Sequence, residues 1–325
     1  MLARHLAVGA ALTALGLVGC AAGAGSQAES PGSRGTTAFS ASPAAPSCGG
    51  NCYGDPEVTG SLSSELVVEV SGVAASHRAA GVYYVVGDEP GTDEVVAIRD
   101  DGTLVARIGV DGMSAENAEA LAVGACGPQD SNPCVFVADI GDHVGRPYVV
   151  VYRFPEPNLT APPPNVVAAD ALRYSYPDAA TDAEALIVDY SGRPLIVSKA
   201  AFDQASATTG PTHVYRGDPG GGVLELLGEI DLPTPDRPVL TGIAGNVVTD
   251  ASSTDGRVLL RTYDQVIEYR APQGGAELGG FRTWPYRLVP APAQIQSEAV
   301  AYRYDCGYLT ISEFTGSIAT VGCHR

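Results

Sequence analysis

A short motif recurs five times along this chain, and its spacing restricts the possible folds more than any other feature. Each copy has Ser, Thr or Glu, then Gly or Ala, then an aliphatic residue and usually Ala. The copies are "SGVA" at 71–74, "EALA" at 119–122, "EALI" at 184–187, "TGIA" at 241–244 and "EAVA" at 298–301. Their starts lie 48 to 65 residues apart, which suits one four-stranded propeller blade with its loops.

Further strand-like runs follow each copy of the motif. The second runs are "GVYYVVGD", "CVFVADIG", "PLIVSK", "RVLLRTY" and "YLTISE". Turn residues separate the first and second runs in three repeats, at Ser191-Gly192, Asp255-Gly256, and Asp305 with Gly307. A third run follows in every repeat and a more polar fourth run in four of them. We therefore predict an all-β protein, a single β-propeller of four-stranded antiparallel blades. Five blades are expected, or six if the longest interval hides a degenerate blade.

The last repeat stops after its third strand, close to the end of the chain. Residues 58–68 could supply the missing fourth strand and so join the two ends of the chain in one blade. Closing the ring in this way removes an exposed sheet edge. We therefore predict a propeller that is closed by an N-terminal strand.

The N-terminal residues predict export. Residues 1–19 have a short basic start and an apolar run that is too short to span a bilayer, which is typical of a secretory signal. The run ends in "LVGC", which resembles a bacterial lipobox and implies lipidation of Cys20. An ordinary signal peptide with a chance cysteine is the alternative. Acyl chains such as palmitate on Cys20 would anchor the protein to the outer face of the cell membrane.

Two further segments follow the signal. Residues 20–47 are rich in Ala, Ser, Gly and Pro and predict a flexible, lipidated tether. Residues 48–325 are expected to form the propeller domain. Six cysteines lie in this domain as three close pairs, which in an exported chain favours disulfides over zinc. The predicted pairs are Cys48 with Cys52, Cys126 with Cys134, and Cys306 with Cys323.

The charge of the chain limits its partners. The net charge of −18 argues against nucleic acid, which requires a basic surface. We expect a monomer whose partners are the membrane, through the lipid anchor, and an unknown protein or cell-wall ligand. Lys199 is the single lysine, beside eighteen arginines.

The repeats predict two columns of polar residues at one end of the central channel. In antiparallel strands, the start of the first strand and the end of the second lie at the same edge of the blade. The first column would hold Ser71, Glu119, Glu184, Thr241 and Glu298. The second would hold Asp88, Asp139, Lys199, Arg261 or Thr262, and Glu313.

Carboxylates that converge repel each other unless cations or protons offset their charge. Calcium or another divalent cation is one solution, with candidate ligands Glu119, Asp139, Glu184, Glu298 and Glu313. Catalysis is another, with a carboxyl of raised pKa as general acid and a cationic group on the substrate anion. Its candidates are Glu119, Asp139, Lys199, Arg261 and Glu298. A third interpretation is a ring of salt bridges that only closes the channel.

The stretch "VFVADIGDHVGRP" at 135–147 places three such groups close together in the sequence. Asp139 ends the second strand and is predicted to face Glu119. Asp142 and His143 belong to the following turn, where Asp often serves the backbone. We expect Asp142 to lie in or near the mouth and His143 to face solvent.

Several phrases of the chain resemble those of uncharacterised actinobacterial β-propeller lipoproteins. They are "NAEALA", "FVADIGDH", "YRFPEP", "EALIVD", "RTY" and "EAVAY", and the likeness covers roughly residues 65–320. A more distant likeness, to phytase-like esterase and SdiA-regulated propellers, implies calcium or phosphoester chemistry. The chain departs from the nearer family at His143, Ser71 and Thr241. It also lacks the dense aspartate clusters of calcium-dependent phytases, which argues against phytase activity.

Three functions remain open. A surface-anchored binding or interaction module is favoured, because no catalytic triad and no "GxSxG" elbow is present. A metal-dependent phosphoesterase or lactonase-like hydrolase is the second hypothesis. A cation-stabilised scaffold of the cell envelope is the third.

Overall fold

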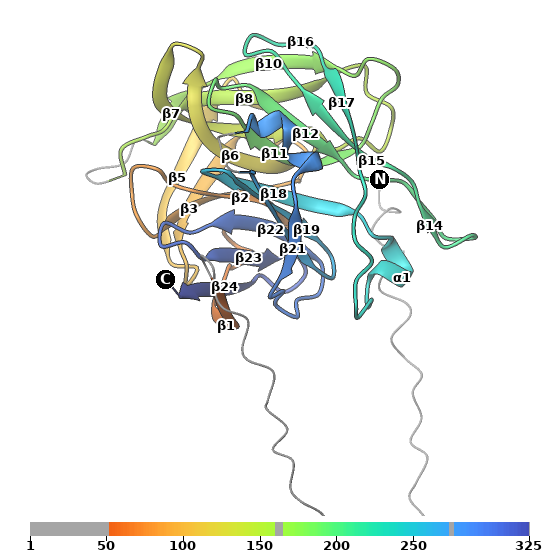
Figure 1. Ribbon diagram of the computed structural model, residues 1–325. Coiled ribbons are helices and arrows are strands. Elements are labelled where there is room, and N and C mark those ends of the chain that lie inside the picture. The colour runs from red at the N-terminus through yellow and green to blue at the C-terminus, as the bar shows by residue number, and fades with distance from the viewer. Residues whose placement is uncertain (1–51, 160–164, 273–275, 325) are drawn as a thin grey trace, which may run out of the picture. The chain divides into compact units, whose positions relative to one another are not determined.

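The computed structural model describes residues 52–159, 165–272 and 276–324. The chain divides into two units, Met1–Ser47 and Cys48–Arg325, and the described residues belong to the second. They form five antiparallel sheets arranged as a five-bladed β-propeller (Figure 1). The all-β, five-bladed prediction is therefore confirmed. The predicted signal and the tether with Cys20 lie outside the described residues. So does Cys48 of the predicted Cys48–Cys52 pair.

Each blade contains four antiparallel strands, which are given below in order from the channel outward. Blade 1 has β2 (Val70–Ala75), β3 (Val82–Gly87), β4 (Glu94–Arg99) and β5 (Leu104–Asp111). Blade 2 has β6 (Ala118–Gly127), β7 (Asp130–Asp139), β8 (Val149–Pro155) and β10 (Asp170–Ser175). Blade 3 has β11 (Ala183–Val188), β12 (Pro194–Ser198), β15 (Thr212–Arg216) and β17 (Glu225–Ile230). Two short strands, β9 (Val166–Ala168) and β16 (Gly222–Val223), add in parallel to the outer edges of blades 1 and 2.

The last two blades complete the ring. Blade 4 has β18 (Val248–Thr254), β19 (Arg257–Thr262), β20 (Val266–Arg270) and β21 (Tyr286–Val289), with a 3₁₀ turn η1 (Leu278–Thr283) before β21. Blade 5 has β22 (Ser297–Tyr302), β23 (Tyr308–Ser312), β24 (Ser317–His324) and, as its outermost strand, β1 (Cys52–Ser61). The small elements β13 (Phe202–Asp203), β14 (Thr208–Thr209) and α1 (Thr241–Ala244) lie between blade strands.

The N-terminal strand closes the ring as predicted, but its position in the sequence differs. β1 spans residues 52–61, not 58–68, and its register sets Ser61 opposite Ser317 at the start of β24. Because β24 starts at Ser317, the chain beyond Ser61 has no strand to pair with and connects to β2. Tyr53 of β1 also donates a 2.5 Å hydrogen bond to the buried Glu268 of blade 4, which ties the closing strand to the neighbouring blade.

The predicted inner strand of blade 4 is wrong. Residues 241–244 form the short helix α1, and the inner strand is β18 instead. β18 and β19 are joined by the tight turn at Asp255-Gly256, whereas 241–244 lie too far from β19 for a hairpin. The carboxylate of Asp264 accepts hydrogen bonds from the backbone N–H groups of residues 239, 240 and 241 and so fixes the entry to α1.

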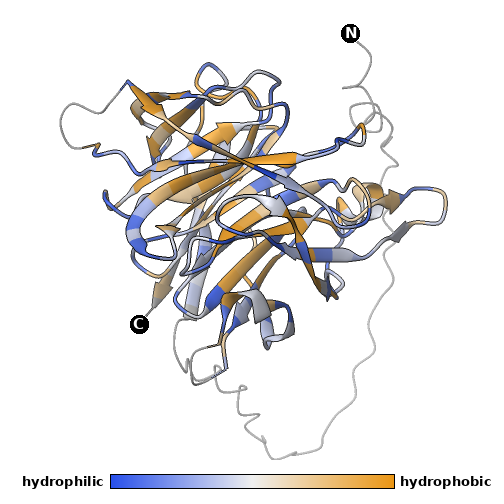
Figure 2. Ribbon diagram, turned by 90° about the horizontal axis from the view of Figure 1, so that it is seen from above, coloured by the Kyte–Doolittle hydropathy of each residue, from blue (hydrophilic) through white to orange (hydrophobic). Residues whose placement is uncertain are grey.

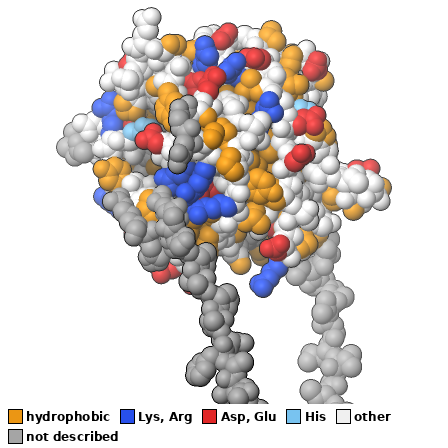
Figure 3. Space-filling model, viewed as in Figure 1, with side chains coloured by type: hydrophobic (Ala, Val, Ile, Leu, Met, Phe, Trp, Pro, Cys, Tyr) orange, Lys and Arg blue, Asp and Glu red, His pale blue; other side chains and the backbone are white. Residues whose placement is uncertain are grey.

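The apolar core consists of five clusters, each between two adjacent blades. Side chains on the two faces of every sheet alternate between the two neighbouring clusters, so the strands are apolar on both faces. Figure 2 shows the strands largely hydrophobic, with hydrophilic residues concentrated in the loops. On the face drawn in Figure 3, acidic side chains are scattered among apolar and neutral ones, as expected for a surface with a net charge of −18.

Two predicted disulfides are present. Cys126–Cys134 staples the β6–β7 hairpin, with its Cα atoms 4.9 Å apart. Cys306–Cys323 joins the turn before β23 to β24, with its Cα atoms 5.9 Å apart. Among the described residues, no helix is long and apolar enough to cross a membrane.

Candidate functional site

Every inner strand carries a bulge at its second residue, and these bulges position the site. In each blade the register shifts by one residue there, so the bulged residue has no partner on the second strand. The five bulged residues are Ser71, Glu119, Glu184, Thr249 and Glu298. A small residue follows the bulge in four blades. In blade 1 this residue is Gly72, and an added Cβ there would lie 2.7 Å from the backbone of β6. The inner strands are thus crowded around the axis, as the motif predicts.

Four of the five bulged side chains, all except Thr249, meet the ends of the second strands in one polar cavity of about 160 Å³. The next residue after each second strand points toward the same end of the channel, apart from blade 2, where this residue is Ile140. We call this cavity the channel mouth. It is lined by Ser71, Asp88, Glu119, His143, Glu184, Lys199, Tyr263, Gln296, Glu298 and Glu313. The predicted convergence of polar columns is therefore present, with the changes described below.

Glu119 is held by neutral donors. Ser71 donates a 2.5 Å hydrogen bond to its Oε2, and the Asn117 side-chain amide donates to its Oε1. Burial, followed by the charge of Glu184, raises the pKa of Glu119 well above its ordinary value. Both oxygens are thus occupied by the protein itself, which makes Glu119 a poorer metal ligand than the sequence indicates.

Lys199 forms an ion pair with Glu184 across the mouth. Its Nζ lies 2.6 Å from Glu184 Oε1 and 5.9 Å from the centre of the Tyr263 ring. Burial opposes a charged lysine, but Glu184 and its neighbours outweigh this effect and raise the pKa of Lys199. Burial also raises the pKa of Glu184. Because the ammonium stays charged and in contact, we take Glu184 as ionised.

Glu298 and Glu313 are two buried or partly buried carboxyls that interact at the mouth. Burial, and then the charge of Glu313, raises the pKa of Glu298 to about 7. Burial, and then the charges of Asp88, Glu69 and Glu184, raises the pKa of Glu313 to about 7. Gln296 donates a 3.1 Å hydrogen bond to Glu313. The Oε2 atom of Glu298 is buried and has no hydrogen-bond partner in the described part of the protein. Such an atom requires a proton, a water molecule or a cation.

Three carboxylates come closest together at the blade 5 and blade 1 side of the mouth. One oxygen each from Glu69, Asp88 and Glu313 lies within 4.8 Å of the others. Burial, and then the charges of Glu69 and Glu184, raises the pKa of Asp88 to about 7. Asp88 Oδ1 is another buried oxygen without a hydrogen-bond partner among the described residues. Calcium prefers such carboxylate oxygens.

Asp139 does not join the mouth. It pairs with Ala118, one residue before the bulge at Glu119, so its side chain points to the other face of the blade. There it accepts hydrogen bonds from the Arg146 guanidinium at 2.8 Å and from the backbone N–H of Asn117 at 3.0 Å. It is a structural ion pair, and its predicted place opposite Glu119 is wrong.

The polar columns also differ from the prediction in blade 4. Thr241 lies on α1, and Thr249 takes the bulge position, where it donates to the backbone oxygen of Ser297. Arg261 is fully buried opposite Asp250 and does not line the mouth. Tyr263, two residues further on, lines it instead. The first error follows from the misplaced inner strand. The second follows from the end of β19, because the residue after the strand, Tyr263, lines the mouth.

The turn after β7 behaves largely as predicted. The carboxylate of Asp142 accepts hydrogen bonds from the backbone N–H groups of residues 144, 145 and 146. His143 is exposed, yet it also lines the mouth, and its Nδ1 lies 3.9 Å from Asp182. Asp142 therefore serves the turn, and His143 stands at the edge of the site.

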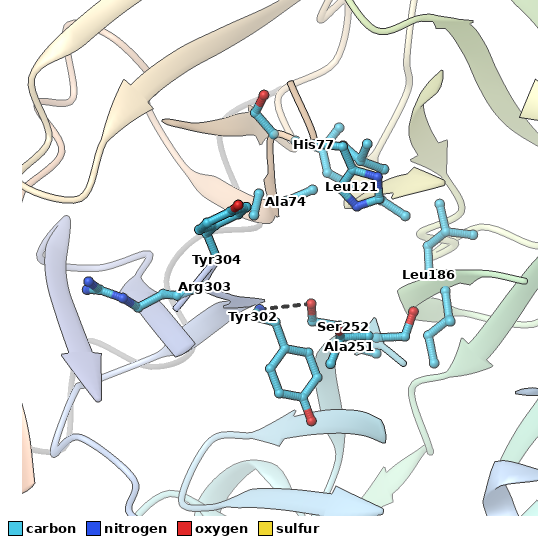
Figure 4. A pocket seen from close by; sticks show the side chains of 16 residues that line it. Ala74, His77, Leu121, Leu186, Ala251, Ser252, Tyr302, Arg303 and Tyr304 are labelled. Atoms are coloured by element: carbon cyan, nitrogen blue, oxygen red, sulfur yellow. Dashed lines mark hydrogen bonds between the residues drawn. The ribbon is translucent and has the colours of Figure 1, made fainter. Parts of the chain in front are cut away.

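Asp250 separates the mouth from a second hollow at the opposite end of the channel. Its carboxylate accepts hydrogen bonds from the backbone N–H groups of Ala251 at 2.7 Å and Val300 at 2.8 Å. It also accepts one from the backbone N–H of Val73. It thus links the inner strands of blades 4, 5 and 1. The second hollow has a volume of about 450 Å³ and is lined by residues near the far ends of the five inner strands (Figure 4).

Besides His143, three residues in or beside the mouth are not predicted from the sequence, and neither is the bulged Thr249. Glu69 and Gln296 lie just before inner strands, and Tyr263 follows a second strand. Thr249 is hidden because Asp250 replaces the small residue of the motif. A search for "Thr, any residue, aliphatic or Ala" starting six residues before the Asp255-Gly256 turn would have found it.

Comparisons with known proteins give only distant structural similarities. No family model matches the chain, and no curated protein matches it. Similar solved structures include a nidogen/laminin complex, with 9% identity, TM-score 0.42, and coverage of 77% of this chain and 74% of that chain. Kuenenia stuttgartiensis hydrazine synthase has 10% identity, TM-score 0.41, and coverage of 79% and 71%.

A further similar structure is XC5397 from Xanthomonas campestris, described as a gluconolactonase. It has 11% identity, TM-score 0.40, and coverage of 82% of this chain and 88% of that chain. At such values the similarity carries no argument about function. The resemblance to actinobacterial propeller lipoproteins stays a prediction, and the chain is a β-propeller whose function is to be argued from its own residues.

Proposed function

We propose that this protein is an exported binding module whose channel mouth holds one divalent cation, calcium or a similar hard ion. The observation that carries the proposal is the group formed by Glu69, Asp88 and Glu313, whose oxygens lie within 4.8 Å of one another. Oxygens that coordinate calcium at about 2.4 Å can be at most about 4.8 Å apart. The spacing of the group is therefore close to what one ion requires.

The electrostatics of the mouth support a cation. Burial and mutual repulsion raise the pKa of Asp88 and Glu313 to about 7, so near neutral pH these groups hold protons that a cation would replace. Glu298 adds a buried oxygen without a hydrogen-bond partner among the described residues. Lys199 offsets the charge of Glu184, on the other side of the mouth.

Exposed apolar side chains around the mouth support a binding role. Val68, Val144, Ile295 and Phe314 are 53%, 70%, 53% and 70% exposed. Each is the chain neighbour of a residue that lines the mouth or belongs to its carboxylate group. Single exposed apolar residues are ordinary, but several around one cavity are typical of an interaction site. The partner we propose is a protein or cell-wall ligand.

Metal analysis tests the cation. Protein purified without chelator should contain about one divalent ion per chain, and EDTA should lower its melting temperature. Protein that contains no divalent ion, and whose melting temperature changes with neither EDTA nor added calcium, would overturn the proposal. If EDTA lowers the melting temperature but no ligand or partner is recovered from envelope extract, the scaffold hypothesis is favoured instead.

A metal-dependent hydrolase is the second candidate, and the raised pKa of Glu298 and Glu313 at the mouth favours it. A carboxyl with a raised pKa can act as a general acid near neutral pH, and a cation when bound would polarise an ester. Lys199 would lie beside the developing negative charge. A panel of phosphoesters and lactones should then show turnover that Glu298→Gln reduces at least about a hundredfold. Turnover equal to wild type would contradict the assignment.

Export and lipidation complete the proposal. The "LVGC" motif at residues 17–20 supports a lipid on Cys20, which would anchor the propeller to the outer face of the membrane. In a bacterial host, the wild-type chain should fractionate with membranes and Cys20→Ser should not. Membrane association that survives Cys20→Ser, with no acyl mass on the N-terminal peptide, would contradict the anchor.

A further inference from the structure

Two insertions build a groove beside the channel mouth. Residues 199–211, between β12 and β15, hold the hairpin β13–β14, and residues 231–247, between β17 and β18, hold α1. Neither contributes a strand to a blade. The two project together from one side of the propeller (Figure 1), and Phe202 packs so close to Gly245 that an added Cβ would lie 2.9 Å from it.

The groove is largely apolar and adjoins the acidic mouth. It has a volume of about 610 Å³, and its apolar lining includes Ala200, Phe202, Pro211, Tyr215, Leu226 and Val247. Lys199 lines both this groove and the mouth. From Lys199 the groove passes along blade 3 to Leu226 on the outermost strand. A polar cavity and an apolar cavity therefore meet at the partly buried ammonium group of Lys199.

We propose that the groove and the mouth together bind one single-chain amphiphile, with an anionic head group at the mouth and an apolar chain in the groove. This inference rests on the proposed cation site. Without a cation the carboxylates of the mouth would repel an anion, and the charge of Lys199 is already paired with Glu184. With a cation bound, the head group has a ligand position and a second positive charge nearby.

The chain half of the ligand follows from the shape and chemistry of the groove. Apolar pockets with a few polar groups at one end orient ligands that have the same division. Burial of each methylene tightens binding about fourfold. Insertions that add a concave apolar surface next to a polar site are typical of specificity-determining loops, so chain length should decide which amphiphiles bind.

Octanoate and butyrate share a head group and test the inference directly. In calorimetry on the calcium-loaded protein, octanoate should bind at least about tenfold more tightly than butyrate, and calcium removal should weaken octanoate at least about tenfold. Ala201→Trp should fill the groove and reduce octanoate binding to the level of butyrate, while calcium binding stays unchanged. Ala205→Trp, exposed in the same hairpin but away from the groove lining, should leave both unchanged.

The outcomes separate the inference from the proposed function. If calcium binds but octanoate and butyrate bind equally, or Ala201→Trp has no effect, the inference is wrong and the cation site stands. If calcium does not bind, the proposed function and the head-group half of the inference both fail. The neutral probe 1-octanol then decides the groove. If Ala201→Trp abolishes 1-octanol binding and Ala205→Trp does not, the result supports an apolar-chain site in the groove. If both variants still bind 1-octanol, the result overturns that site.

Discussion

The motif predicts which individual side chains line the mouth in those blades where the inner strand is identified correctly. Glu119, Glu184, Lys199, Glu298 and Glu313 all line the mouth as the sequence predicts. Asp139 and Arg261 do not, because side chains alternate between the two faces of a strand and a one-residue shift reverses their direction. The sequence does not fix the pairing of these second strands, which sets Asp139 opposite Ala118 and Arg261 opposite Asp250.

The pH dependence of stability tests the crowded carboxyls. In the folded protein Asp88 and Glu313 have a pKa of about 7, whereas unfolded carboxyls titrate near 4. The folded state thus holds protons that the unfolded chain releases, so the stability of cation-free protein should fall as pH rises from about 4 to about 7. With chelator present, the melting temperature should be lower at pH 8 than at pH 5.

Substitution of Glu313 identifies the source of this effect. Glu313→Gln should reduce the fall in melting temperature between pH 5 and pH 8, because it removes one of the groups that must ionise. Glu57→Gln, an exposed glutamate on β1, should leave the fall unchanged. Equal slopes for all three proteins would show that the mouth carboxyls titrate normally.

The corrected role of Asp139 gives a second prediction at this scale. Asp139→Asn breaks a buried ion pair with Arg146 and should lower the free energy of unfolding by about 3 kcal/mol. Because the residue lies outside the mouth, calcium affinity should not change. Calcium binding that disappears while the fold is intact would restore the sequence-based placement.

At the level of strands, the hydrophobic runs and turn residues indicate where most blade strands lie, but they do not fix where each strand begins and ends. The closing strand β1 and the inner strand β18 were the difficult ones, for different reasons. β1 is polar because it forms an outer edge, and its limits are fixed by pairing with β24. β18 is hidden because Asp250 interrupts the small-residue pattern, while 241–244 imitate it by chance.

Closure of the ring gives the prediction for elements. Tyr53 of β1 donates a hydrogen bond to Glu268, which three arginines also approach from blade 4. Tyr53→Phe removes a donor to a buried carboxylate and should lower the free energy of unfolding by about 1–3 kcal/mol in denaturant titration. Tyr304→Phe, at an exposed tyrosine, should change it little. Equal effects would mean that this contact does not secure the closing strand.

For the whole molecule, the repeat count and spacing suffice to predict five blades, because each blade buries both faces against its neighbours. This repetition produces the five apolar clusters, one between each pair of adjacent blades. The filling of the channel could not be predicted. It depends on Asp250, whose carboxylate satisfies backbone N–H groups on three blades.

Asp250 therefore has a testable role in the whole ring. Asp250→Ala leaves three buried N–H groups without their acceptor and should lower the free energy of unfolding by about 3 kcal/mol or more. Asp250→Asn keeps one carbonyl oxygen and should cost less. Denaturant unfolding compares the two, and equal losses would contradict the proposed bridging of blades.

Calcium titration of chelator-treated protein tests the central claim, a cation at the channel mouth, most directly. Isothermal titration calorimetry near pH 8 should show one site per chain in the wild type and in the Glu57→Gln control. Glu313→Gln should weaken calcium binding at least about tenfold, because one of three carboxylate ligands is lost. No binding in the wild type, or equal binding in Glu313→Gln, would contradict the account.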